Sequence, residues 1–323
     1  SYSSDLGYGL RAVTGEVVAY SHSNEISKNS LKQSANNLSS TLKSQKGIYN
    51  HEIPQSNEKF YNNPLAEYHS FDIRDMDACY PLFEGVDTVF HLAAFSRIQV
   101  AMQNPQACIE TNIQGTINML ECARKWGVRR FVNSSTSSLY GLKNEPPLEE
   151  SMATDCLNHY SASKRSAEIM CQMYHNLFGL RTITLRYFNV YGDRQPLKGL
   201  YAPVVGLFLE QKKAGKPLTV VGDGLQRRDF THVSDVVEAN IDAMLCNFSG
   251  IEINIGTGTN TSVIDLANMI GGEIEYIPER PGEARETLAS VYKAAVALNW
   301  FPRKKIEDYI HEELENTPAL SWR

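Results

Sequence analysis

From about residue 85 onward, short apolar runs rich in β-branched residues alternate with longer amphipathic segments. Strands buried on both faces of a parallel sheet have this composition, and the amphipathic segments repeat with the period of helices. We expect strands over 86–94, 129–136 and 181–189, with helices over 105–127 and 158–178 between them. Because parallel neighbours are joined by crossover helices, the pattern predicts an α/β fold built on a doubly wound parallel sheet.

Beyond Asn189 the pattern loosens into a loop that carries glycine and proline, and shorter elements follow. They are expected as a helix over 204–214, a strand over 218–224, a helix over 234–245 and a strand over 252–256. We interpret this third of the chain as a smaller α/β lobe that forms the second wall of a cleft. The expected domains are 1–190, built around the sheet, and 191–323, the substrate lobe, from which about 228–260 return to the first domain.

The first 70 residues do not continue this pattern. Positions 21–64 are crowded with serine and asparagine and hold few apolar residues, so we expect an irregular insertion there. A strand is expected over 14–21, and residues 1–13 before it could form a helix.

Composition restricts the class of protein. A net charge of −6 and a pI near 5.8 argue against nucleic acid or an anionic membrane as the main partner. No run approaches the ~18 apolar residues of a membrane-spanning helix, and the first residues lack the features of a secretory leader. The six cysteines contain no C-x-x-C pair and are expected as reduced core thiols, which makes the cytoplasm the expected location. We predict no metal site.

Polar side chains end two of the expected strands. Ser134, Ser135 and Thr136 end the strand over 129–136, and Asn189 ends the next one. Ligands bind at this edge of an open parallel sheet, although serines also cap turns and helices, which is the alternative interpretation.

The helix between these strands carries Tyr160 and Lys164, which lie four positions apart and therefore on one face. Chance alone can supply such a pair in a chain with 16 tyrosines. Its position between two polar strand ends is what indicates a proton-transfer site.

Eight motifs occur in order across residues 66–315: FDIRD (71–75), VFHLAA (89–94), FVNSSTSSLYG (131–141), NHYSASK (158–164), RYFNVYGDRQ (186–195), VVGDGLQRRDFTHVSDVV (220–237), INIGTG (253–258) and RPGEARET (280–287). Together they resemble the extended short-chain dehydrogenases/reductases of the NAD-dependent epimerase/dehydratase family, most closely the UDP-glucose and UDP-N-acetylglucosamine 4-epimerases. The resemblance implies a Rossmann-type NAD-binding domain and a UDP-sugar substrate.

The resemblance also implies catalytic roles. Tyr160 would take the proton of the sugar 4-hydroxyl while a hydride passes from C4 to NAD⁺, and Thr136 would bind the same sugar oxygen. A tyrosine at its ordinary pKa of ~10 is a poor base, and a Lys164 cation ~5 Å away at an effective dielectric of ~20 would lower that pKa by ~2 units. Dehydratases of the family carry Asp-Glu after the threonine. Here Ser137 and Ser138 follow it, so the implied reaction is inversion at C4 through a 4-keto sugar.

Further residues match the family's binding positions. Those implied for NAD are Asp72, Ile73, Leu92, Ala93, Ala94, Ser134, Ser135, Tyr160, Lys164 and Tyr187. Those implied for the UDP-sugar are Ser96, Arg97, Thr136, Asn189, Val221, Arg228, Arg280 and Thr287. Guanidinium groups suit the diphosphate oxygens. The small side chain of Thr287 is expected to leave room for a 2-acetamido group, which adds UDP-N-acetylhexosamines to the expected substrates.

The chain departs from the family at its beginning. It lacks the glycine-rich turn G-x-x-G-x-x-G, where a helix N-terminus receives the cofactor pyrophosphate. If 14–21 is the family's second strand, the first strand and its turn lie upstream of Ser1, a hypothesis that an intact mass of 36.2 kDa would refute. Natural loss, or a first segment that departs from the native chain, are the alternatives. Because "YSHSN" (20–24) lacks an acidic residue for the ribose, NAD over NADP rests on the resemblance alone.

Three functions therefore stay open. The first is an active UDP-sugar 4-epimerase, and the second is a catalytically inactive nucleotide-sugar-binding homologue, which the missing glycine turn favours. The third is an NAD-dependent reductase or decarboxylase on the same scaffold. The resemblance also implies a homodimer in which the helices over 105–127 and 158–178 of both subunits form a four-helix bundle.

Overall fold

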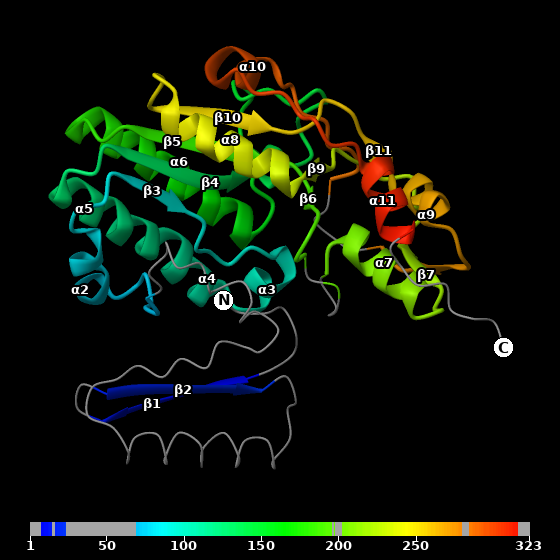
Figure 1. Cartoon of the computed structure of the whole chain (residues 1–323), viewed down its shortest axis with the longest axis horizontal. Helices are drawn as coiled ribbons and strands as arrows, with labels where there is room; N and C mark the ends of the chain where they lie inside the picture. Colours follow the sequence, from blue (N-terminus) through cyan, green and yellow to red (C-terminus); the bar gives the residue numbers. More distant parts are fainter. Residues whose placement is uncertain are drawn as a thin grey trace. The chain divides into compact units, whose positions relative to one another are not determined.

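A computed structural model describes residues 8–14, 17–23, 69–195, 197, 202–279 and 284–315 of the chain. It contains two compact units, residues 1–71 and 72–323 (Figure 1). The sheet predicted from the sequence belongs to the second unit.

The first unit contains an antiparallel pair of strands, β1 (Tyr8–Thr14) and β2 (Val17–Ser23). The strand expected over 14–21 is therefore present with shifted ends, whereas the helix suggested for residues 1–13 is wrong in its described part. Pairing with β2 gives the backbone N–H and C=O groups of β1 hydrogen-bond partners on a neighbouring strand, which a local sequence pattern does not reveal. The antiparallel pairing also differs from the parallel pairing expected for the family's second strand. Most of the insertion expected over 21–64 lies outside the described residues.

A four-stranded parallel sheet forms the centre of the second unit, in the order β10-β5-β4-β3. Its strands are β3 (Thr88–His91), β4 (Arg130–Thr136), β5 (Thr182–Tyr187) and β10 (Ile251–Ile255). All four were expected from their apolar β-branched runs, so the predicted parallel α/β sheet is confirmed.

Helices cover both faces of this sheet (Figure 1). Phe131 of β4 packs with α5 (Thr116–Trp126) and α6 (His159–Phe178). Its neighbour Val132 points to the other face and packs with α8 (Val233–Leu245) and α10 (Tyr292–Leu298). The alternation of side chains along a strand thus buries β4 on both faces over its whole length, its polar carboxyl end included.

Local sequence determines where α6 begins and ends. The side chain of Asn158 accepts a hydrogen bond from the backbone N–H of Ser161, and the Ser161 hydroxyl returns a contact to the backbone of Asn158. Gly179 ends the helix in the left-handed region at φ 71°. These caps place Tyr160 and Lys164 in the first two turns.

The helix expected over 105–127 is continuous but not uniform. It consists of α4 (Pro105–Ile109), a π-helical segment (Glu110–Gly115) and α5. A helix of six residues, α3 (Ile98–Gln103), precedes it. The π-helical segment lies next to the predicted site, which is where such segments often occur.

The remaining elements form smaller groups. β7 (Leu218–Val221) pairs in parallel with β12 (Ile274–Ile277), and α7 (Val204–Lys213), α9 (Val263–Ile270) and α11 (Ile306–Glu315) surround this pair through a shared apolar core. Short pairs join β6 (Val190–Tyr191) with β9 (Thr231–His232) and β8 (Arg227–Arg228) with β11 (Thr261–Ser262). Short helices lie at α2 (Met76–Cys79), at 80–83 and at 137–140.

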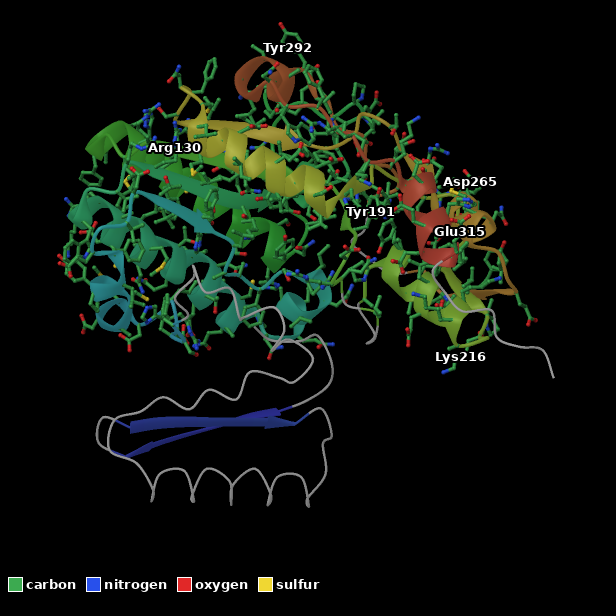
Figure 2. The ribbon with its side chains drawn as sticks, viewed as in Figure 1. Arg130, Tyr191, Lys216, Asp265, Tyr292 and Glu315 are labelled. Atoms are coloured by element: carbon green, nitrogen blue, oxygen red, sulfur yellow. The ribbon has the colours of Figure 1, made fainter. Side chains whose placement is uncertain are left out.

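The amino end of β4 is anchored by Arg130, which Figure 2 labels. Its guanidinium donates hydrogen bonds of 2.6 Å to the carbonyl oxygen of Phe248 and 2.5 Å to that of Cys246. All six cysteines are free thiols, four of them buried. In the described ranges no helix is both long and apolar enough to cross a membrane.

Candidate active site

The carboxyl ends of the parallel strands bring predicted polar residues to one edge of the sheet. In the sheet register Thr136 of β4 lies beside Tyr187 of β5, and Tyr187 lies beside Ile255 of β10. The segments that follow these strands therefore begin close together. Open parallel sheets bind their ligands at this edge.

Lys164 is attached to the end of β4. Its Nζ donates a hydrogen bond of 2.8 Å to the carbonyl oxygen of Ser134. The Ser134 hydroxyl lies 3.0 Å from the Tyr187 phenol oxygen, and this phenol donates to Oδ1 of Asn240 at 3.0 Å. Because the Tyr187 proton goes to Asn240, the Ser134 hydroxyl is the donor to Tyr187. Ser134 therefore joins α6 to both strands.

Tyr160 lies in the first turn of α6, and its ring is buried against apolar side chains of α3, α4 and the loop after β3. Burial raises the pKa of its phenol, while a side-chain hydrogen bond with Thr136 and the positive charge of Arg97 act in the opposite direction. Burial also lowers the pKa of the Lys164 ammonium, to about 8. The structure thus brings Thr136 and Tyr160 together, but burial raises the pKa of Tyr160, and the cation that counteracts this is Arg97. The lowering of this pKa that was expected from Lys164 is therefore not found.

Asn189 and Thr287 meet on the other side of this edge. The Asn189 Nδ2 donates to the Thr287 Oγ1 at 3.1 Å and to the carbonyl oxygen of Asp229 at 3.0 Å. The carboxylate of Asp229 in turn accepts hydrogen bonds from the backbone N–H groups of Thr257, Gly258 and Ala289, at 2.7 to 3.1 Å. Both N–H groups of the Asn189 side chain are therefore used within the protein.

The predicted residues after β3 form an open rim. Leu92 is 59% exposed, Ala93 and Ser96 are exposed, and Ala94 and Arg97 are half-buried. Exposed apolar side chains next to a buried polar strand end leave a surface on which a flat ligand ring can lie.

Asp72 and Ile73, predicted at the adenine end, are held by local contacts. The carboxylate of Asp72 pairs with Arg74 at 2.6 Å. Ile73 packs in the core, and its carbonyl oxygen accepts a hydrogen bond of 2.9 Å from Asn118 of α5.

Two predicted residues of the substrate lobe are placed by β7 and β8. Val221 ends β7 and is half-buried, and its carbonyl oxygen accepts from Gln226. The Arg228 guanidinium donates to the carbonyl oxygens of Arg227, at 2.9 Å, and Arg285, at 3.3 Å. The predicted Arg280 lies outside the described residues.

The sequence reasoning missed Asn112, in the π-helical segment. Its amide pairs with the backbone of Phe95, Oδ1 accepting from the N–H at 2.7 Å and Nδ2 donating to the carbonyl at 3.1 Å. Nδ2 also donates to the Ser163 hydroxyl at 2.9 Å, and that hydroxyl contacts the Tyr160 carbonyl at 2.8 Å. Asn112 therefore links the rim to the turn that carries Tyr160. An amide in the middle of an expected amphipathic helix was the available signal.

The donor set does not suggest a metal centre. Among the residues that the structure describes, no three His, Cys, Asp or Glu side chains are grouped so that they could hold an ion.

A sequence profile of the NAD dependent epimerase/dehydratase family matches residues 34–256. The chain belongs to this family. A UDP-glucuronate 4-epimerase of Thermodesulfobacterium geofontis is 34% identical to this chain over 253 residues, which are 75% of this chain and 76% of that protein. A crystal structure of a UDP-glucose 4-epimerase of Thermotoga maritima with UDP-glucose has a TM-score of 0.75 at 33% identity, covering 78% of this chain and 84% of that one. The Thermus thermophilus UDP-glucose 4-epimerase in complex with NAD has a TM-score of 0.71 at 29% identity, covering 77% and 84%.

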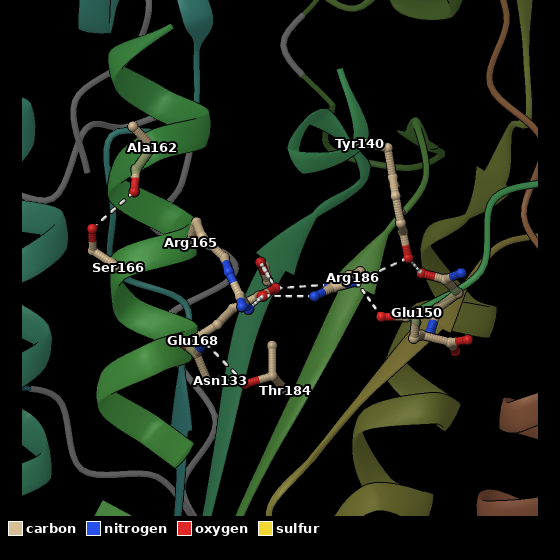
Figure 3. Close-up of polar contacts among 11 residues, drawn as sticks. Asn133, Tyr140, Glu150, Ala162, Arg165, Ser166, Glu168, Thr184 and Arg186 are labelled. Carbon is tan, nitrogen blue, oxygen red and sulfur yellow. Dashed lines mark hydrogen bonds and ion pairs between the residues drawn. The ribbon is translucent and has the colours of Figure 1, made fainter. Parts of the chain in front are cut away.

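The family motif Y-x-x-x-K is followed here by a second buried group that the motif did not reveal. Glu168, four residues after Lys164, forms an ion pair with Arg186 of β5 at 2.8 Å (Figure 3). Ser135, expected at the cofactor, donates its hydroxyl to Glu168 at 2.6 Å. A charged residue inside the apolar run of β5 was the signal in the sequence, because a buried arginine requires an acidic partner.

Proposed function

We propose that this chain inverts the configuration at C4 of a UDP-sugar, with NAD as cofactor. The observation that carries the proposal is the grouping of Thr136 and Tyr160 at the end of β4, with Lys164 bonded beside them to Ser134. Tyr160 takes the proton from the sugar 4-hydroxyl and returns it, and Thr136 binds the same oxygen. The cation of Arg97 favours the phenolate that the first of these steps requires.

Part of the described chain fits a nicotinamide cofactor. Lys164 is a buried cation that donates a hydrogen bond to a backbone carbonyl, and the rim after β3 exposes apolar surface. Bound NAD would supply the hydride acceptor and donor that the side chains lack. Ser134, Tyr187 and Lys164 would hold its nicotinamide end, and Asp72 and Ile73 its adenine end. The sequence contains no glycine-rich turn for the pyrophosphate, so we propose no contact for that group.

Inversion is favoured over dehydration. After Thr136 the chain has Ser137 and Ser138, and the Ser138 hydroxyl is 3.2 Å from the Thr136 hydroxyl. Hydroxyl groups at these positions cannot serve as the carboxylic acid and carboxylate that elimination of water from C5 and C6 requires.

The substrate lobe would bind the UDP group and the sugar. We propose Arg228, Arg280 and Asn189 at the diphosphate and Val221 and Ser96 along the nucleotide sugar. Because the side-chain N–H groups of Asn189 bond within the protein, its contact to phosphate would come from the main chain. Thr287 stays the proposed determinant of 2-acetamido sugars. Its hydroxyl also accepts from Asn189, so a larger residue there would disturb the diphosphate side as well.

We also propose a homodimer formed through α5 and α6. Ile169, which is 45% exposed, comes nine residues after Tyr160 and therefore lies on the opposite, outer side of α6, where its apolar side chain is available to a second copy. The division into domains at 190/191 stays a proposal, and β10, in the returning segment, lies in the main sheet. The cytoplasm is the proposed location, because six free thiols suit a reducing compartment.

The test is conversion of UDP-glucose to UDP-galactose by the purified chain with added NAD, followed by chromatography, together with UDP-glucuronate and UDP-N-acetylglucosamine. Product from one of them, lost in Tyr160→Phe, supports the proposal. Binding of UDP-sugar without turnover would instead identify the inactive homologue. Net conversion of NADH to NAD⁺ would identify a reductase and release of CO₂ a decarboxylase, since an epimerase regenerates its NAD⁺ and releases no carbon.

A further inference from the structure

Glu168 is a buried carboxylate that the proposed reaction does not use. Its side chain is 0% exposed, and its two oxygens accept four hydrogen bonds (Figure 3). Oε1 accepts from the Ser135 hydroxyl at 2.6 Å and from Arg186 Nε at 2.9 Å. Oε2 accepts from the Arg186 terminal nitrogen at 2.8 Å and from Arg165 at 2.9 Å. One side chain of α6 thereby contacts the ends of β4 and β5.

These contacts reach the strand segment that carries the candidate catalytic threonine. Lys164 bonds to the carbonyl oxygen of Ser134, and Glu168, one helical turn later, bonds to the hydroxyl of Ser135. A helix held to a strand at one point can pivot about that point. Held at two successive residues, it is aligned with the strand segment that ends at Thr136.

Three cationic side chains surround the single carboxylate of Glu168. Arg165 and Arg186 both bond to its carboxylate, and Lys164 lies on the same helix face one turn away. Glu168 acts against the burial that lowers the pKa of Lys164. Without this carboxylate, the buried cations of Lys164 and Arg186 would remain in a region with little access to water, beside the partly exposed Arg165.

Arg186, the main partner of Glu168, is itself held by further hydrogen bonds. Arg186 donates to the Tyr140 phenol oxygen at 3.0 Å, and this phenol donates to Oδ1 of Asn254 in β10 at 2.7 Å. Glu168 therefore acts from a rigid base that spans three strands of the sheet, as a supporting group must to hold a site in place.

We propose that Glu168 is a positioning residue, which aligns the Tyr160–Lys164 turn of α6 with the end of β4 and places a negative charge one helical turn from Lys164. The expected effect of Glu168 on kcat rests on the proposed function, whereas its expected effect on the titration of Lys164 does not.

The kinetic test compares Glu168→Gln and Ser135→Ala with the wild type. Glu168→Gln keeps the shape of the side chain but removes its charge, and Ser135→Ala cuts only the bond to the strand. We expect kcat to fall about 100-fold in the first and about 10-fold in the second, since small misplacements of reacting groups have effects of this size. In Glu168→Gln the KM for the UDP-sugar and the bound NAD per chain should change less than about three-fold, because Glu168 is not one of the proposed binding groups.

The matched control is Glu121→Gln. Glu121 is a helix carboxylate that bonds to Arg124 and Tyr174 in α5 and α6, away from the strand ends. Its kcat should stay within about two-fold of the wild type, as expected for a group that supports packing only.

The second readout needs no turnover. The pH midpoint at which Lys164 becomes reactive is measured on the full chain by trace acetylation with acetic anhydride and peptide mass spectrometry. Removing a nearby negative charge should lower this midpoint by about one unit in Glu168→Gln and leave it unchanged in Ser135→Ala. If the wild type epimerises no UDP-sugar, the proposed function fails, while this comparison still decides the role of Glu168.

An unchanged Lys164 midpoint in Glu168→Gln would overturn the inference, and so would an unchanged kcat in an active enzyme. Losses of NAD and UDP-sugar binding that parallel the loss of kcat would show a general structural role instead. If Glu168→Gln does not fold, Ser135→Ala decides, and a wild-type kcat in that variant refutes the alignment.

Discussion

The Lys164 ammonium donates a 2.8 Å hydrogen bond to the carbonyl oxygen of Ser134, 30 positions earlier in the chain. This contact joins the helix that presents Tyr160 to the strand that ends at Thr136. It also holds a positive charge in a buried setting, and for this reason the pKa of Lys164 falls to about 8.

Replacing Lys164 by Met is expected to alter stability in a pH-dependent way. The folded pKa of about 8 lies below the ordinary value of 10.5, so between these values the unfolded chain binds one more proton than the folded chain. The free energy of unfolding of the wild type therefore rises with pH across this window, whereas Lys164→Met lacks this contribution. The difference in unfolding free energy should move in favour of the wild type by about 3 kcal/mol between pH 7 and 10.5. Urea unfolding at both pH values measures it, and a constant difference would contradict the assignment.

Removal of the Tyr160 hydroxyl should abolish the proposed reaction and spare binding. In Tyr160→Phe we expect kcat to fall by more than about 1,000-fold, because the Ser138 hydroxyl, which also bonds to Thr136, cannot replace the phenol as a base. The UDP-sugar Kd, from calorimetry, should change little. Tyr174→Phe, which loses the hydroxyl that bonds to Glu121 on the same helix, is the control and should stay active.

The charge of Arg97 should determine the pH at which kcat declines on the acid side of its pH profile. Its charge favours the phenolate of Tyr160, so Arg97→Gln raises the Tyr160 pKa further. The acid limb of the kcat profile should move to higher pH, and Arg97→Lys should restore part of the shift. Arg129→Gln, which removes an exposed partner of Asp87, is the control. Superimposable profiles for Arg97→Gln and the wild type would count against this role.

Asp229 should be required for both stability and nucleotide binding. In Asp229→Asn an amide nitrogen would face backbone N–H groups of Thr257, Gly258 or Ala289, which need an acceptor. We expect a loss of about 3 kcal/mol in unfolding free energy and weaker UDP binding, because the neighbouring Arg228 and Asn189 lose their support. Asp223→Asn affects an exposed ion pair with Arg285 and should change stability by less than about 1 kcal/mol.

Thr287 can be tested for size and for hydrogen bonding separately. Thr287→Val keeps the size but removes the acceptor for Asn189, and Thr287→Tyr changes both. If space is what admits the 2-acetamido group, the ratio of kcat/KM for UDP-N-acetylglucosamine to UDP-glucose should fall only in Thr287→Tyr. An equal fall in both variants would assign the effect to Asn189 instead.

The sheet was predictable because strands that are buried on both faces are rich in apolar and β-branched residues. β3, β4 and β5 read as β-branched apolar runs, and Asn158 and Gly179 mark the ends of α6. The helix suggested for residues 1–13 failed because β1 is determined by its partner β2, which a local pattern does not reveal. The π-helical segment around Asn112 was missed for a similar reason, since its side-chain contacts lie on other elements.

The sequence by itself determined the parallel α/β fold, the family motifs and the positions of Tyr160, Lys164 and Thr136, because periodicity, caps and motif spacing are properties of the chain read in order. Only the tertiary structure decided which cation acts on Tyr160, that Asn189 bonds to Thr287, and that Glu168 joins Ser135 to Arg186. The physical reason is that burial, charge and hydrogen bonding depend on distances between residues far apart in the chain, and those distances exist only after the strands and helices have packed.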